Sequence, residues 1–408
     1  MEPTARSLNA LFALVCLCLH CWVGASGAPG QELSILGVDA AAAAPSDPGA
    51  AGSVDARGPA AMPSPEAEAP RPGTGVAAPF LVIGHRGSPR THPENTIPSF
   101  EEAMRQGANA LEIDVCYTQD DRIVLWHDPD HSNVVATARE LGLEPGMRYR
   151  PYVPDLWSPL RRPVHEMDLA TFRANHKYIR IDADPLDPAS LFSGLSSFAS
   201  SPVDFLVDLF TSTLAAPAPA PSDVPIPTFY EFCEWAAKVP KLGRVFVDVK
   251  VPAHLVGRFS RTAAWVLKQW NLGDRIIFMS TSREAVETMK ATLGETGAAF
   301  AHDQVVTGVV PSAAEFSAVD AAERAGCSYA PIGKPVLCVK PWSTYREVIA
   351  ADLKKRGSRR LVAWTINDPG ELRALVEMGV DGIMTDTPGV LCRIAAEMGK
   401  AAAASQVD

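Results

Sequence analysis

Two short apolar runs decide how the strands of this chain are counted, and both lie in residues 110–128, ALEIDVCYTQDDRIVLWHD. The first run is Ala110–Val115 and the second is Arg122–Trp126, with a polar turn between them. Parallel neighbours need a crossover of about a dozen residues or more, and this turn is too short for one. The second run is therefore predicted to return antiparallel, as a hairpin that brings His127 back towards Asp114.

Eight apolar runs, one of them Ala110–Val115, alternate along the chain with stretches of helical periodicity. They are Leu81–Gly84, Ala110–Val115, Val245–Val249, Arg275–Met279, Ala298–Ala301, Ser328–Ile332, Leu361–Thr365 and Gly382–Thr385. Between the last two, Leu372, Leu375 and Val376 share one helical face. Strands that alternate with helices in this way predict an α/β fold, namely a TIM (β/α)₈ barrel.

Length and composition allow two or three domains or one large barrel with attachments, and the strand pattern above favours the second. The chain has 408 residues, of which 47% are hydrophobic and 21% charged, so it can bury a sizeable core. An α/β barrel takes roughly 250 residues. We expect the barrel over residues 80–400, a large insertion at 128–226 between the second strand and the helix that follows near Thr228, and a tail at 401–408. The insertion is expected to form a small subdomain over the barrel mouth.

The N-terminal residues have the order of a secretory signal. An apolar run from Leu8 to Ala25 follows Arg6, and small residues come after it. Residues 1–28 are therefore expected to be a signal peptide, and the protein to be secreted or extracytoplasmic. An uncleaved membrane anchor is the less favoured alternative. Residues 29–79 are rich in Ala and Pro and are expected to be a disordered linker.

Charge and cysteine content narrow the class of protein. A net charge of −10 argues against a nucleic-acid partner, because nucleic-acid binders usually carry a basic surface. Three of the eight cysteines lie in the N-terminal apolar run. The other five show no CxxC spacing, and the sequence assigns no disulfide among them. They are Cys116, Cys233, Cys327, Cys338 and Cys392.

Polar residues collect at the carboxyl ends of the predicted strands, which is where TIM barrels carry their sites. They are His85, Arg86, Glu112, Asp114, His127, Asp248, Lys250, Trp364, Asn367, Thr385 and Asp386. Residues i and i+2 of a strand point to one side. Glu112 and Asp114 therefore share a side, and so do Asp248 and Lys250. Taken singly, each is more often a solvated strand face, a surface histidine or a cross-strand charge pair; their common position favours a site.

The residue types at this predicted rim suit phosphate chemistry with a metal. Three carboxylates that converge would repel one another unless a cation lay between them, and oxygen ligands suit Mg²⁺ or Ca²⁺. Arg86 and Lys250 could grip an anion. Two histidines beside a metal and a phosphate can serve as general acid and general base.

At these positions the sequence resembles the glycerophosphodiester phosphodiesterase family. The matching segments are Gly84-His85-Arg86-Gly87, Pro93-Glu94-Asn95-Thr96, Leu111-Glu112-Ile113-Asp114-Val115, His127-Asp128, Ile226-Pro227-Thr228 with Glu231, Asp248-Val249-Lys250, Trp364-Thr365-Ile366-Asn367 and Gly379–Asp386. The resemblance covers about residues 80–395 and is poor in the insertion.

The resemblance implies a metal-dependent TIM-barrel enzyme that hydrolyses glycerophosphodiesters, such as glycerophosphocholine, to glycerol 3-phosphate and an alcohol. It implies an acid–base pair in His85 and His127, and a divalent cation, Mg²⁺ or Ca²⁺. The ligands implied for this cation are Glu112, Asp114 and Asp248. Substrate or phosphate contacts are implied for Arg86, Lys250 and Trp364, although Trp364 suits the core equally well. The Pro93–Thr96 segment is expected to open the first helix, where it could also favour an anion.

One departure keeps a second function open. Asp248 stands where the family usually has Glu, and the Asp-x-Lys form resembles the sphingomyelinase D/phospholipase D toxins. The alternative is therefore a lysophospholipase D or sphingomyelinase D-like enzyme that acts on the headgroups of lysophospholipids or sphingomyelin. An apolar stretch at residues 191–210 would then give transient membrane contact, although it also suits the insertion's own core. A third hypothesis is a binding protein on a retired barrel. Neither the oligomeric state nor the choice between water and a substrate hydroxyl as nucleophile is predicted.

Overall fold

The computed structural model describes residues 79–400 except 143, 145, 156, 182–221, 306–315 and 335–340. The predicted signal peptide, the linker, Cys338, the apolar stretch at 191–210 and the C-terminal tail lie outside the described residues. Within the described ranges, no helix has the length and apolar character needed to cross a membrane.

The centre of the described chain is a closed parallel barrel. Its strands are β1 (Leu81–Gly84), β2 (Ala110–Tyr117), β6 (Arg244–Val249), β7 (Ile276–Ser280), β8 (Ala299–His302), β10 (Tyr329–Gly333), β11 (Arg360–Trp364) and β12 (Gly382–Thr385). Strand β1 pairs in parallel with both β2 and β12, which closes the ring. Each predicted apolar run forms one of these strands, so the predicted α/β TIM barrel is confirmed.

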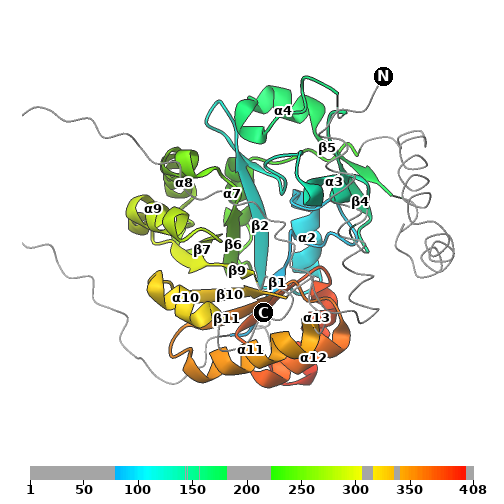
Figure 1. The fold of residues 1–408 in the computed structure, drawn as a ribbon. Helices are drawn as coiled ribbons and strands as arrows, with labels where there is room; N and C mark the ends of the chain where they lie inside the picture. Colours follow the sequence, from blue (N-terminus) through cyan, green and yellow to red (C-terminus); the bar gives the residue numbers. More distant parts are fainter. Residues whose placement is uncertain are drawn as a thin grey trace, which may run out of the picture. The chain divides into compact units, whose positions relative to one another are not determined.

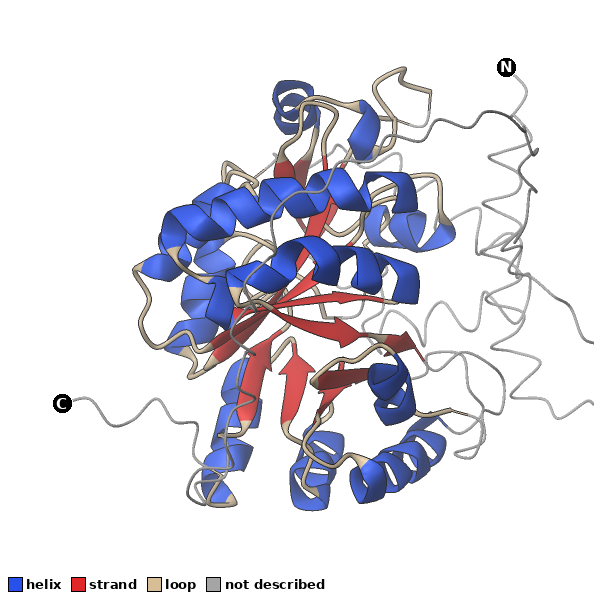
Figure 2. Cartoon of the chain, turned by 90° about the vertical axis from the view of Figure 1, so that its left-hand side faces the viewer, coloured by secondary structure: helices blue, strands red, loops and turns tan. Residues whose placement is uncertain are grey.

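Helices surround the strands (Figure 2). They are α2 (Ile97–Arg105), α7 (Phe229–Ala237), α8 (Val256–Trp270), α9 (Arg283–Leu293), α10 (Ala318–Arg324), α11 (Pro341–Lys355), α12 (Pro369–Met378) and α13 (Pro388–Glu397). A two-residue strand, β9 (Gln304–Val305), pairs with β10. The predicted helix near Thr228 is α7, whose first turn is closed by a capping box between Thr228 and Glu231.

The predicted hairpin is confirmed. Strand β3 (Ile123–Leu125) pairs antiparallel with β2, with Val115 opposite Leu125. Beyond the hairpin, the backbone N–H of Trp126 donates to the backbone oxygen of Asp114 at 3.1 Å. This bond brings His127 to the end of β2 at which Asp114 lies.

The described part of the insertion packs on this hairpin. It includes α3 (Val134–Glu140), β4 (Tyr149–Tyr152), α4 (Leu169–Asn175) and β5 (Lys177–Arg180), which are drawn in the upper right part of Figure 1. Strands β4 and β5 form an antiparallel pair. Trp126 of the hairpin end joins Phe172 and Tyr178 of the insertion in one buried cluster. The insertion therefore shares a core with the hairpin that carries His127.

Side chains inside the barrel change from apolar to polar along the strands. A separate buried cluster includes Ile83, Ala110, Phe246, Ala301, Val362 and Met384. Two residues further along each strand come His85, Glu112, Asp248, Asp303, Trp364 and Asp386. Because alternate residues of a strand share a side, these polar groups form the next layer on the same inner face.

The cysteines in the described ranges are free thiols. Cys116, Cys233 and Cys327 are buried, and Cys392 is half-buried. The sequence left a disulfide open, and none forms among these four.

Gly87 allows the loop after β1 to lie against α2. Its φ is +90°, and a Cβ at this position would lie 2.5 Å from the Oγ of Ser99 and 2.7 Å from its carbonyl carbon. The same Ser99 Oγ donates to the backbone oxygen of Arg86 and accepts from the N–H of Ser88. A side chain at Gly87 would therefore displace Ser99, whose two hydrogen bonds hold the loop.

We predict that Gly87→Ala lowers the free energy of unfolding by about 2 kcal/mol or more, because strain at positive φ adds to overpacking. Gly379→Ala is the matched control, since its φ is +88° and a Cβ there would meet nothing within 4 Å. It should lose only about 1 kcal/mol. Urea unfolding of both variants measures the difference, and equal losses would show that the contact with Ser99 is unimportant.

Candidate active site

Three carboxylates converge at the mouth of the barrel. Glu112 and Asp114 belong to β2 and Asp248 to β6, where Asp248 is the register partner of Asp114. Ligand oxygens of the three side chains all lie within 4.8 Å of one another. Glu112 and Asp114 are buried. The structure thus brings together the three residues that the sequence proposed as metal ligands, and this set of oxygen donors is one that hard divalent cations prefer.

The three carboxyl groups differ in how well they hold negative charge. Burial and the neighbouring charge of Asp114 raise the pKa of Glu112 to about 8. Burial would also raise the pKa of Asp114, but His127, Arg86 and Lys250 outweigh it and lower that pKa to about 2. Burial raises the pKa of Asp248, against the opposing effect of Lys250. The neighbouring cations therefore do not stabilise the ionised form of all three carboxyl groups at once.

Lys250 reaches this cluster from β6, as its spacing from Asp248 predicted. Its Nζ lies 2.5 Å from Oδ2 of Asp248 and 3.7 Å from Oδ1 of Asp114. Burial lowers the pKa of Lys250, but the two aspartates outweigh burial and the net shift is upward. The side chain keeps 28% of its surface exposed. It is a permanent cation that also meets solvent at the mouth.

Arg86 lies beside the cluster but is surrounded by acids. Its Nη1 donates to Glu94 at 2.8 Å, and its Nε lies 3.1 Å from Oδ2 of Asp114. Its backbone N–H donates to Oε2 of Glu112 at 2.9 Å. The guanidinium is buried. Arg86 therefore neutralises and positions the carboxylates, in addition to any contact with an anion.

The Pro93–Thr96 segment opens α2 and supports Asp114. Thr96 is the residue before the helix, as expected. Asn95 exchanges two hydrogen bonds with Asp114: its Nδ2 donates to Oδ2 at 3.0 Å, and its Oδ1 accepts the backbone N–H at 3.1 Å. Asn95 has a φ of +55°, in the left-handed region of backbone conformation. The segment is thus a helix start that also orients one acid of the cluster.

His85 is held by a carboxylate from the last strand. Its Nδ1 lies 2.7 Å from Oδ1 of Asp386, and its Nε2 lies 3.9 Å from Oε2 of Glu112. Burial and Arg86 lower the pKa of His85, but Asp386 and Glu112 outweigh them and the net shift is upward. Asn367 fixes Asp386 from the other side, accepting its backbone N–H at 2.9 Å.

Asp386 was named among the polar strand ends but was not predicted as a site residue. Its place two residues after Met384, and its position at the end of the family-like segment Gly379–Asp386, were the available signals.

His127 has a similar partner next to it in the chain. Its Nδ1 lies 2.6 Å from Oδ1 of Asp128, which is buried. Burial, Arg86 and Arg139 hold the pKa of His127 well below its usual range. Each of the two histidines thus has its Nδ1 engaged by a carboxylate, which leaves Nε2 for other partners.

Trp364 is half-buried and borders the polar layer of the barrel. Its Nε1 donates to Oδ1 of Asp303 at 2.7 Å. Its ring lies against Gly333, where a Cβ would approach the indole to 2.9 Å. Burial and the charge of Asp248 raise the pKa of Asp303 to about 7. The sequence did not single out Asp303; its place two residues after Ala301 was the available signal.

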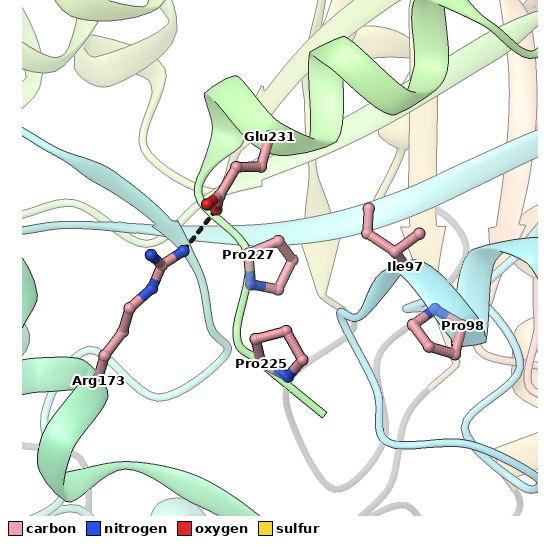
Figure 3. A pocket seen from close by; sticks show the side chains of 6 residues that line it. All are labelled: Ile97, Pro98, Arg173, Pro225, Pro227 and Glu231. Carbon is pink, nitrogen blue, oxygen red and sulfur yellow. Dashed lines mark hydrogen bonds and ion pairs between the residues drawn. The ribbon is translucent and has the colours of Figure 1, made fainter. Parts of the chain in front are cut away.

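A separate cavity of about 230 Å³ lies away from these groups. Its lining is mainly apolar, with three prolines and the ion pair between Arg173 of α4 and Glu231 of α7 (Figure 3). None of the predicted site residues lines it. The ion pair joins the insertion to the barrel, and we assign the cavity no chemistry.

A model of the glycerophosphoryl diester phosphodiesterase family matches residues 85–390. The chain belongs to this family. The match begins directly after β1, includes the other seven barrel strands and both histidines, and confirms the resemblance seen in the sequence.

Individual relatives match more locally. A glycerophosphodiester phosphodiesterase from Caldanaerobacter subterraneus subsp. tengcongensis is 50% identical over 48 residues, which is 12% of this chain and 20% of that protein. Glycerophosphodiester phosphodiesterase domain-containing protein 4 of Macaca fascicularis is 49% identical over 49 residues, 12% of this chain and 8% of that protein. The matched part is thus at most a fifth of these relatives.

A solved structure shares the fold of this chain at low sequence identity. The crystal structure of a glycerophosphoryl diester phosphodiesterase homologue from Silicibacter pomeroyi DSS-3 superposes with a TM-score of 0.56 at 19% identity. The superposition covers 79% of this chain and 96% of that one. At this identity the likeness supports the barrel fold alone.

We predict that Asp386→Asn lowers the pKa of His85. In this family member Asp386 raises that pKa against burial and Arg86, so removing its charge leaves the lowering effects in control. The imidazole signals in an NMR titration of the metal-free protein measure the shift. Asp381→Asn is the control, because Asp381 pairs with Arg356 instead. A His85 pKa that stays unchanged in Asp386→Asn would contradict the assigned contact.

Proposed function

We propose that this protein hydrolyses glycerophosphodiesters, such as glycerophosphocholine, to glycerol 3-phosphate and an alcohol. The observation that carries the proposal is the pairing of two histidines, each held at Nδ1 by a carboxylate, with a cluster of three acids at the barrel mouth. Membership of the glycerophosphoryl diester phosphodiesterase family supports the substrate class.

The three-acid cluster is proposed to hold a divalent cation, Mg²⁺ or Ca²⁺. Glu112, Asp114 and Asp248 supply oxygen donors within 4.8 Å of one another, and a bound cation would stabilise the ionised form of Glu112, whose pKa is raised without one. When bound, such a cation neutralises charge that develops on a phosphate. The shorter Asp248 side chain reaches the cluster because it lies directly beside Asp114 in the β2–β6 pair.

The chain's own residues would bind the diester and move its protons. Lys250 is a partly exposed cation at the mouth, suited to a phosphate oxygen. With Nδ1 engaged, each histidine offers Nε2 for proton exchange. One histidine takes the proton from the attacking oxygen, and the other gives a proton to the leaving oxygen. Trp364, pinned by Asp303, would form a wall beside the substrate.

The test is turnover of glycerophosphocholine by the purified protein with Mg²⁺ or Ca²⁺, followed as glycerol 3-phosphate. His85→Ala and His127→Ala should each lower kcat by about 100-fold or more, because each removes one proton-transfer group. His254→Ala, at an exposed position, should leave kcat unchanged. A chelator should stop turnover, and added cation should restore it. Absence of glycerol 3-phosphate with every divalent cation would refute the proposal.

Lysophosphatidylcholine provides the second arm of the same assay. Asp248 motivated a lysophospholipase D-like alternative, but its carboxylate lies within the acidic cluster. We therefore expect glycerophosphocholine to be the better substrate by kcat/KM. Faster release of choline from lysophosphatidylcholine would favour the alternative.

A further inference from the structure

Arg139 is a buried arginine of the insertion that reaches the acid–base residues of the barrel. It lies on α3, and its side chain is only 6% exposed. Its Nη1 donates to Oδ2 of Asp128 at 2.5 Å, and its Nε donates to Oε2 of Glu144 at 2.8 Å. Its Nη2 donates to Oε1 of Glu94. All three nitrogens of the guanidinium are thus engaged with carboxylates.

Two of these carboxylates belong to segments that form the site. Asp128 uses its other oxygen, Oδ1, to hold Nδ1 of His127 at 2.6 Å. Glu94 uses its other oxygen, Oε2, to accept from Arg86. Arg139 therefore closes a continuous chain of contacts from the insertion to His127, and a second one to the loop after β1.

We propose that Arg139 is a positioning residue for the reaction: the insertion supplies it, and through Asp128 it sets the orientation of His127. The inference rests on the function proposed above. A carboxylate that is bound at one oxygen only can rotate about its last side-chain bond, and the imidazole would rotate with it. A charged donor at the second oxygen removes that freedom, and charge-assisted hydrogen bonds are the stronger kind.

A purely structural role is the competing explanation, since Arg139 also ties the insertion to the barrel. Arg161 provides a matched control from the same insertion. Its side chain is 9% exposed, it donates twice to Glu140, and it donates to the backbone oxygens of Pro154 and His131. These partners do not include His127 or Asp128. Loss of Arg161 should loosen the insertion without touching the chain of contacts that leads to His127.

The experiment is a double-mutant cycle in the full-length protein, with glycerophosphocholine as substrate. Arg139→Met should lower kcat roughly 10- to 100-fold, as loss of an orienting partner typically does, and should change KM by less than about threefold. In an Asp128→Ala background, Arg139→Met should lower kcat by less than about threefold further, because the group it acts through is already gone. Arg161→Met should lower the melting temperature yet keep kcat within about threefold of the wild type.

The outcomes separate the two claims. Equal kcat losses in the wild-type and Asp128→Ala backgrounds would overturn the positioning role, and so would an Arg161→Met loss as large as that of Arg139→Met. Arg139→Lys, which keeps the charge but only one nitrogen, serves if Arg139→Met does not fold; its kcat should lie between those of the wild type and Asp128→Ala, and a wild-type kcat would count against the proposal. An inactive wild type would instead refute the proposed function itself.

Discussion

Negative charge buried at the barrel mouth is the constraint on which the rest of the site depends. The acids there are Glu94, Glu112, Asp114, Asp128, Asp303 and Asp386, all of them buried. Ionised carboxylates are costly to bury unless they are paired and hydrogen-bonded. Arg86, Arg139 and Lys250 supply charge, and Asn95 and Asn367 supply hydrogen bonds. These partners do not suffice for Glu112, whose pKa rises to about 8 so that the protonated form is favoured. A cation is proposed to bind beside it and to stabilise its ionised form.

The positions of the acids other than Glu94 follow from the geometry of strands and from one hairpin. Residues two apart on a strand share a side, so the polar layer continues the apolar interior of the barrel without a break. The β2–β3 hairpin folds back on β2 and delivers His127 to Asp114. The insertion then packs on the same hairpin, which places Arg139 against Asp128. Fold and site are therefore built by the same few contacts.

The barrel could be predicted because its pattern is local. Each strand is a short apolar run, and the four-residue turn before Arg122 was enough to predict an antiparallel return. The convergence of Glu112, Asp114 and Asp248 follows from their places at the carboxyl ends of neighbouring strands and from the alternation of side chains along a strand. The partners of the histidines do not, because Asp386 meets His85 across 301 positions of sequence, and Arg139 meets Asp128 through the fold of an insertion with weak periodicity. Side-chain contacts of that kind depend on packing, which periodicity does not encode.

The central claim is that the three converging carboxylates form a cation site, and anomalous scattering from crystals grown with Mn²⁺ tests it most directly. Mn²⁺ takes the oxygen ligands that Mg²⁺ takes and gives an identifiable signal. We predict an anomalous peak between Glu112, Asp114 and Asp248, with an oxygen of each side chain coordinating the ion. A peak elsewhere, or none at saturating Mn²⁺, would contradict it.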